Sequence, residues 1–108
     1  MQKTPTTGWD GKPQYVVYRG QTIECFRIGA LATALNRTVS SIRAMRLKGV
    51  LCHPPLQNGN GQWLFTRSQI EDLVALAEAE GVLNPNYRRT FSATFIEQAH
   101  LILHRLPI

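Results

Sequence analysis

"IGALATALNRTVSSIRAMRLKGVL", residues 28–51, predicts two short helices joined by a tight turn. In its first third, apolar residues recur three and four positions apart, which is the spacing of one buried helix face over residues 28–35. Asn36 follows, and asparagine tolerates the left-handed backbone that a tight turn between helices requires. We therefore expect the first helix to end at Asn36 and a second helix to follow at once.

The second helix is predicted over residues 39–48. Thr38 is a favourable N-cap residue, and Gly49 is a typical helix stop. Three apolar side chains fall on one face and should pack against the first helix: Val39, Ile42 and Met45. The opposite face carries small and basic side chains, so it should be exposed and able to approach a partner closely.

Short β-prone runs flank this helix pair. "YVVY" and "TIECF", residues 15–18 and 22–26, predict a hairpin before it. After it, residues 50–52 and 63–65 should form the strands of a second hairpin around the polar loop of residues 56–62. The glycines and asparagines of this loop suit a flexible tip.

Two longer helices are predicted toward the C-terminus. Thr66 with Gln69 is a capping-box pattern that opens a helix reaching about residue 80. Residues 92–105 carry an apolar stripe at helical spacing. Three roles stay open for this last helix: packing on its own domain, homodimerisation or head-to-tail assembly, and docking to another protein.

The order helix, turn, helix, hairpin, helix is that of a winged helix-turn-helix domain. We expect an α+β fold of this kind with an N-terminal β-hairpin and a C-terminal amphipathic helix. The predicted division is a loose arm over residues 1–14, the winged domain with its leading hairpin over residues 15–83, and a helical extension over residues 84–108. Helix 39–48 occupies the position of the recognition helix, which lies in the major groove of DNA in such domains.

Basic charge is concentrated in the middle of the chain. Residues 26–70 hold six basic side chains and no acidic one, whereas the rest holds six basic and seven acidic side chains. Such a segment in a small domain favours an anionic partner, with double-stranded DNA as the leading candidate. The alternatives are a solvated or protein-facing surface and an RNA-binding surface. RNA is disfavoured because no pair of aromatic residues is placed to stack splayed bases.

These residues resemble the DNA-binding domain of MerR-type regulators and the related phage excisionases. The resemblance covers about residues 26–77 and has three parts: an aromatic-x-Ile-Gly-x-Leu-Ala helix, a helix that ends in Lys-Gly-Val-Leu, and an aromatic-Thr helix start after the wing. The matching residues are Phe26, Ile28, Gly29, Leu31, Ala32, Val39, Ile42, Arg43, Lys48, Gly49, Val50, Leu51, Phe65, Thr66, Gln69 and Ile70. The resemblance implies binding of duplex DNA, either as a transcriptional regulator or as an excisionase-like architectural factor.

The chain departs from that family pattern at the wing and in the recognition helix. Trp63 stands where such regulators carry a wing arginine that grips phosphate, and Ala44-Met45 replaces their aromatic pair. The usual acid next to that pair is Arg46. A short segment follows Gly81 in place of a dimerising coiled coil and effector domain, which favours an excisionase-like or small phage-type protein.

A set of residues on the recognition helix, its flanks and the wing is predicted to contact DNA. Arg43 could reach a guanine edge bidentately, and the small side chains of the helix permit close approach to base edges. The wing tip carries no basic residue, so its electrostatic contribution should be weak. The set comprises Arg27, Arg37, Thr38, Ser40, Ser41, Arg43, Ala44, Arg46, Leu47, Lys48, Asn58, Asn60, Trp63 and Arg67. For Trp63, packing of the wing against the helices is an alternative role.

Membrane and secreted classes receive no support from the sequence. No apolar run reaches the roughly 20 residues of a membrane span. The N-terminus has no apolar stretch suited to a secretion signal, so we expect a cytoplasmic, nucleoid-associated protein without a membrane partner. Its expected partners are duplex DNA and, through the last helix, further copies of the chain or another protein.

Metal and catalytic sites receive equally little support. Cys25 and Cys52 with His100 and His104 could be written as a Cys₂His₂ zinc site, but the cysteines lack the short spacing of such sites. We expect no metal, no cofactor and no disulfide framework. No nucleophile–base arrangement or phosphate loop is visible, so we expect a binding protein and not an enzyme. A protein–protein adaptor that reuses the winged fold is the alternative function.

Overall fold

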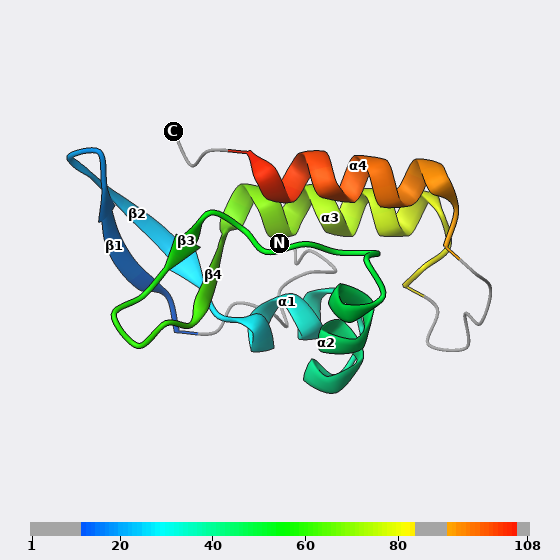
Figure 1. Ribbon diagram of the computed structural model, residues 1–108, viewed down its shortest axis with the longest axis horizontal. Coiled ribbons are helices and arrows are strands. Elements are labelled where there is room, and N and C mark those ends of the chain that lie inside the picture. Colours follow the sequence, from blue (N-terminus) through cyan, green and yellow to red (C-terminus); the bar gives the residue numbers. More distant parts are fainter. Residues whose placement is uncertain (1–11, 84–90, 106–108) are drawn as a thin grey trace, which may run out of the picture.

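The computed structural model describes residues 12–83 and 91–105, and this part of the chain folds into eight elements. They are β1 (Gln14–Tyr18), β2 (Gln21–Phe26), α1 (Ile28–Ala34), α2 (Val39–Leu47), β3 (Leu56–Gln57), β4 (Trp63–Thr66), α3 (Arg67–Ala79) and α4 (Ala93–His104). In Figure 1, α3 and α4 lie side by side as one layer, α1 and α2 lie across from them, and the sheet closes one end.

The turn between α1 and α2 is built on Asn36. Its φ of 58° is left-handed, as predicted for a tight turn between helices. This conformation lets the backbone N–H of Arg37 donate a 2.8 Å hydrogen bond to the carbonyl of Ala32, which caps the end of α1. The two helices are therefore joined by the short segment of residues 35–38, and the conformation of this turn sets the angle between them.

Both ends of α2 follow the predicted signals. The Thr38 hydroxyl accepts a 3.1 Å hydrogen bond from the backbone N–H of Ser41 and so acts as the N-cap. At the other end Gly49 has a φ of 83°, and the N–H of Val50 returns to the carbonyl of Met45 at 2.9 Å. Together with the 3.0 Å bond from the N–H of Gly49 to the carbonyl of Arg46, this bond forms a Schellman motif, which ends the helix and turns the chain back toward the core.

The N-terminal hairpin is part of the wing sheet. The four antiparallel strands have the order β1-β2-β4-β3. Strand β2 pairs with β4 through Cys25 opposite Thr66 and Phe26 opposite Phe65. This pairing joins segments about forty residues apart, and it gives the hairpin the place in the fold that the sequence left unassigned.

The first strand of the wing was predicted wrongly at residues 50–52. Val50 and Leu51 are buried but lie outside any strand, and β3 is formed instead by Leu56 and Gln57. Pro54 and Pro55 explain the shift, because proline has no N–H to donate to a sheet and pairing with β4 can begin only after them. The wing loop is correspondingly shorter than expected.

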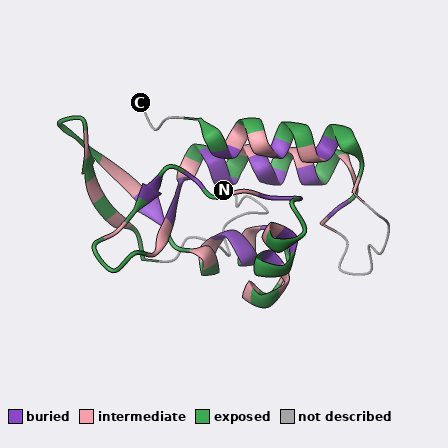
Figure 2. Ribbon diagram, viewed as in Figure 1, coloured by how far each residue is buried: buried purple, intermediate pink, exposed green. Residues whose placement is uncertain are grey.

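The core is one large cluster shared by all four helices. Phe26 and Phe65 join it from the sheet, and Phe95, Ala99 and Leu103 join it from α4. Figure 2 shows these buried faces of α3 and α4 turned toward the interior, whereas α2 is exposed along its outer side. Of the three roles considered for the last helix, packing on its own domain is the one present in the structure.

The end of the sheet has a small core of its own. Cys25, Leu56 and Leu64 are buried there, with Val16 and Tyr18 packed against them. Because β1 alternates, Tyr15 and Val17 point to the other side and are 63% and 76% exposed. The hairpin therefore stiffens the wing from one face and leaves an apolar face open.

Candidate nucleic-acid interface

The outer face of α2 carries the residues that the sequence singled out. Ile42 and Met45 are buried, while Ser40, Arg43, Ala44 and Leu47 are exposed. These four lie three or four positions apart, so they form one stripe along the helix. Leu47 is 79% exposed at the end of this stripe, and Lys48 follows it at the C-cap. The stripe is polar at its first turn and apolar near its last.

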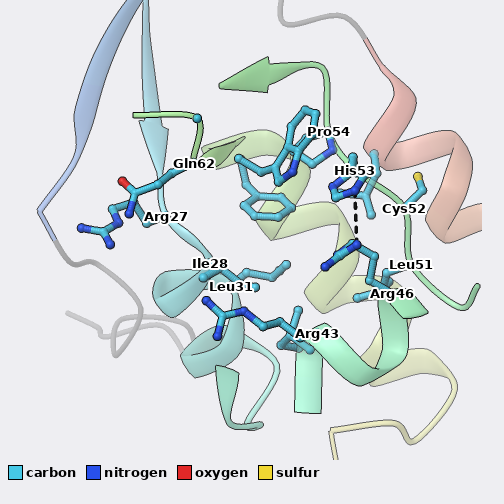
Figure 3. Close-up of a pocket in the computed structure, with 15 residues that line it drawn as sticks. Arg27, Ile28, Leu31, Arg43, Arg46, Leu51, Cys52, His53, Pro54 and Gln62 are labelled. Carbon is cyan, nitrogen blue, oxygen red and sulfur yellow. Dashed lines mark hydrogen bonds between the residues drawn. The ribbon is translucent and has the colours of Figure 1, made fainter. Parts of the chain in front are cut away.

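A cleft of about 280 Å³ separates α2 from the wing (Figure 3). Arg43 and Arg46 reach it from α2, and Arg27 reaches it from the start of α1. In Figure 3 the Arg27 side chain lies beside Gln62 of the wing, at the far side of the cleft from Arg46. The floor is apolar and includes Ile28, Leu31, Ile42, Leu51 and Phe65. No carboxylate is among the described residues that line it.

The three arginines of this cleft form no ion pair with a carboxylate among the described residues. Within residues 12–83 and 91–105, the ion pairs are Arg67 with Glu24 and Arg105 with Asp72, and neither involves Arg27, Arg43 or Arg46. Like charges gathered around a partly apolar cleft repel one another, and an anion entering it would relieve this repulsion. The cleft is thus electrostatically suited to a phosphate.

His53 contacts both α2 and the wing at this cleft. Its Nε2 lies 3.2 Å from Nη1 of Arg46, and its ring stacks on Trp63 with centroids 4.2 Å apart. Partial burial, with a smaller contribution from the positive charge of Arg46, lowers the pKa of His53 from its usual value. The imidazole is therefore neutral at neutral pH, and the Arg46 guanidinium donates to it. His53 was not among the residues predicted from the sequence, because neither of its partners, Arg46 and Trp63, is indicated by local spacing.

Trp63 is half-buried in this stack and does not project freely from the wing. This stacking contact is with the segment between α2 and β3, whereas Phe65 of the same strand joins the core shared by the helices. The Trp63 indole faces the His53 imidazole, so the residue that replaces the family's wing arginine supports a titratable ring instead of a permanent charge. Whether Trp63 itself contacts DNA stays a prediction.

Two arginines of the predicted set are tied into the fold. Arg37 donates a 2.6 Å hydrogen bond from Nη2 to the carbonyl of Val82, just beyond α3. Arg67 donates from Nε to Glu24 at 3.3 Å, and its guanidinium lies 5.0 Å over the Phe26 ring. Both side chains hold elements together, and their predicted contacts to DNA stay predictions.

The wing tip is organised by Asn58. Its side-chain oxygen accepts from the N–H groups of Asn60 and Gln62 at 2.9 and 3.0 Å. Its amide nitrogen donates to side-chain oxygens of Gln14 and Gln62 at 3.1 and 2.8 Å. Asn58 thus shapes the loop from within, whereas Asn60 is exposed at the tip. The bond to Gln14 also fixes the start of β1 beside the wing.

The two cysteines and two histidines that were weighed as a zinc site, and not predicted to form one, do not all come together in the described structure. Cys25 is in the small sheet core, where burial, reinforced by the charge of Glu24, raises the pKa of its thiol to about 11. His100 on α4 is hydrogen-bonded to the carbonyl of Gly49 at 2.9 Å. In the described part of the chain, no group of three potential metal-ligating side chains comes together.

None of the helices in the described part of the chain is long and apolar enough to cross a membrane.

A tight helix pair, an exposed second helix and a β-wing beside it define a winged helix-turn-helix protein, and the predicted α+β fold is confirmed. Residues 26–78 match the family described as MerR HTH family regulatory protein, and this part of the chain belongs to that family. The chain thus contains a MerR-type helix-turn-helix DNA-binding domain, as the resemblance implied. No curated protein and no solved structure gives a significant match to the chain.

Proposed function

We propose that the protein is a small DNA-binding regulator or architectural factor that places α2 in the major groove of duplex DNA. One observation carries this proposal: the exposed stripe of α2 adjoins a cleft whose three arginines have no counter-charge among the described residues. A major groove is wide enough to admit one helix, and the phosphates beside it would meet the cleft.

The residues divide into two roles under this proposal. Ser40, Arg43, Ala44 and Leu47 face the base edges, since they form the outer stripe of α2. Arginine pairs well with guanine, and apolar side chains pair with the methyl group of thymine. The remaining contacts go to the backbone and come from the other members of the predicted set: Arg27, Arg37, Thr38, Ser41, Arg46, Lys48, Asn58, Asn60, Trp63 and Arg67.

An excisionase-like or small phage-type role is the finer form of the proposal. It is supported by α4, which covers α3 with Phe95, Ala99 and Leu103 and so completes a compact module. Such a module bends or marks DNA through several copies on adjacent sites and acts in the cytoplasm at the nucleoid. Assembly of these copies through the last helix is part of the proposal.

The experiment that tests the proposal is a titration of a labelled random duplex, followed by fluorescence anisotropy at several salt concentrations. We expect the logarithm of affinity to fall linearly with the logarithm of salt concentration, by about 0.9 per neutralised phosphate. Absence of binding at low salt would reject the proposal. Selection of bound sequences from a random pool would then give the target site and the spacing of half-sites.

A protein–protein adaptor is the second candidate. It is favoured by the exposed side chains Tyr15 and Val17 on β1, an outer strand without charged residues. Apolar groups on an open sheet edge are suited to pair with another chain. This candidate predicts that Val17→Lys abolishes partner binding, whereas the DNA-binding proposal predicts no effect of Val17→Lys on duplex affinity.

A further inference from the structure

We propose that the cleft between α2 and the wing is a proton-linked phosphate site, in which His53 acquires a positive charge when a DNA backbone phosphate enters. This inference rests on the proposed function, because the phosphate is that of a bound duplex. In this inference, His53 contacts the phosphate that a permanently charged wing residue would otherwise bind.

The geometry holds His53 ready for such a contact. Its neighbours Leu51 and Pro54 are buried, so the backbone is anchored, while the His53 side chain itself is exposed at the cleft. One face of the ring lies against Trp63, and its Nε2 points to Arg46. A phosphate placed between these groups could be reached from the wing side and from α2 together.

The cleft around His53 disfavours its protonation through both burial and charge. Arg43 and Arg46 face the cleft from α2, and Arg27 faces it from the start of α1. Cys52, the neighbouring residue, is neutral because burial raises the pKa of its thiol. No carboxylate is among the described lining residues, so the permanent charges of this lining are all positive. Partial burial and, to a smaller extent, the positive charge of Arg46 lower the pKa of His53, so the free protein disfavours its protonation.

A bound phosphate reverses this balance. Its negative charge offsets the arginines and favours the imidazolium, which can donate a hydrogen bond to a phosphate oxygen. Arg46 then turns from His53 to the phosphate, and Trp63 can support the cationic ring from its face. The proton comes from solvent, and no bond other than the N–H of His53 is formed or broken.

The sign of the pH dependence follows from this uptake. The pKa of His53 is lowered in the free protein and raised in the complex, so binding is accompanied by uptake of a proton between these two values. Affinity for DNA should be highest below the pKa of the free protein and should fall as pH rises through the pKa of the complex. Each unit of difference between the two values corresponds to about a tenfold change in affinity.

The test is a titration of one labelled duplex at constant ionic strength between about pH 8 and about pH 5.5, where histidine titrates. The wild-type protein should bind several-fold more tightly at the acidic end. His53→Gln, which cannot become charged, should give a flat profile. His53→Arg, which is always charged, should bind as tightly at the alkaline end as the wild type does at the acidic end.

His104→Gln is the matched control, because His104 is an exposed histidine of α4 and does not line the cleft. It should keep the wild-type profile. Equal pH profiles for wild type and His53→Gln would overturn the inference, as would a profile for His53→Arg that is as steep as that of the wild type. Absence of binding by every variant at every pH would instead reject the proposed function. Thermal unfolding at both ends of the pH range verifies that all variants are folded.

Discussion

Gln69, in the first turn of α3, donates a 3.3 Å hydrogen bond from its side-chain amide to the backbone carbonyl of Leu103, in the last turn of α4. The same side chain accepts a 2.9 Å bond from the backbone N–H of Thr66, and it is only 2% exposed. One buried amide thus closes the capping box of α3 and pins α4 to it.

Gln69→Leu should destabilise the fold strongly. The substitution keeps the volume but leaves the carbonyl of Leu103 and the N–H of Thr66 without their side-chain partner in the interior, at a cost of about 1–3 kcal/mol for each unsatisfied group. Urea unfolding followed by circular dichroism measures the loss. Gln98→Leu on the exposed side of α4 is the control and should change stability by less than about 0.5 kcal/mol.

Thr38→Ala should destabilise the first turn of α2. The Thr38 hydroxyl accepts from the N–H of Ser41, and loss of such a cap costs about 1 kcal/mol. The midpoint of urea unfolding should fall without a change in slope. Thr38→Ser keeps the accepting oxygen and should restore the midpoint. If serine proved no better than alanine, the effect would lie in packing and not in the cap.

The salt dependence of DNA binding should separate the arginines of the cleft from those paired elsewhere. Arg27→Ala removes a charge without a partner carboxylate in the described structure, so it should lower the salt slope by about 1. Arg105→Ala removes the same charge from an ion pair with Asp72 on α3 and α4, and it should leave the slope nearly unchanged. Equal effects of both substitutions would show that only net charge matters.

Leu47 should read thymine methyl groups. It is 79% exposed beside Ala44 on the outer stripe of α2, and apolar side chains recognise that methyl in the major groove. On a selected binding site, replacing thymine by uracil should weaken the wild-type protein by about 1 kcal/mol or more at the contacted position. Leu47→Ala should weaken binding to the thymine site and lose this discrimination. Undiminished discrimination by Leu47→Ala would assign the methyl contact to another residue.

The local signals of the sequence were sufficient for the helices. Thr38, Asn36 and the Thr66–Gln69 box act within three or four residues, so their pattern predicts their geometry directly. The exposed stripe of α2 followed from the same periodicity. The pairing of β2 with β4 was missed because it joins segments about forty residues apart. The first wing strand was placed wrongly although Pro54 and Pro55 are a local signal against a strand before Leu56.

The distribution of charge at the cleft could be predicted only in part from local sequence patterns. The sequence located the basic segment and singled out Arg43 on the exposed side of its helix, but it indicated no protein partner for any of the arginines. Only the fold shows that Arg37 is bonded to Val82, that Arg67 is paired with Glu24, and that Arg46 meets His53. Each of these contacts joins two segments of the chain that no single helix or strand contains, so the spacing of residues along one helix or strand could not indicate it.

The bond between Gln14 and Asn58, together with the ladder from β2 to β4, makes the hairpin and the wing a single stiff plate. A stiff plate transmits displacement along its length. A molecule that bound the outer strand at Tyr15 and Val17 could therefore tilt the wing tip relative to α2. Binding of a neighbouring protein to the hairpin would then change the position at which the wing loop contacts a duplex.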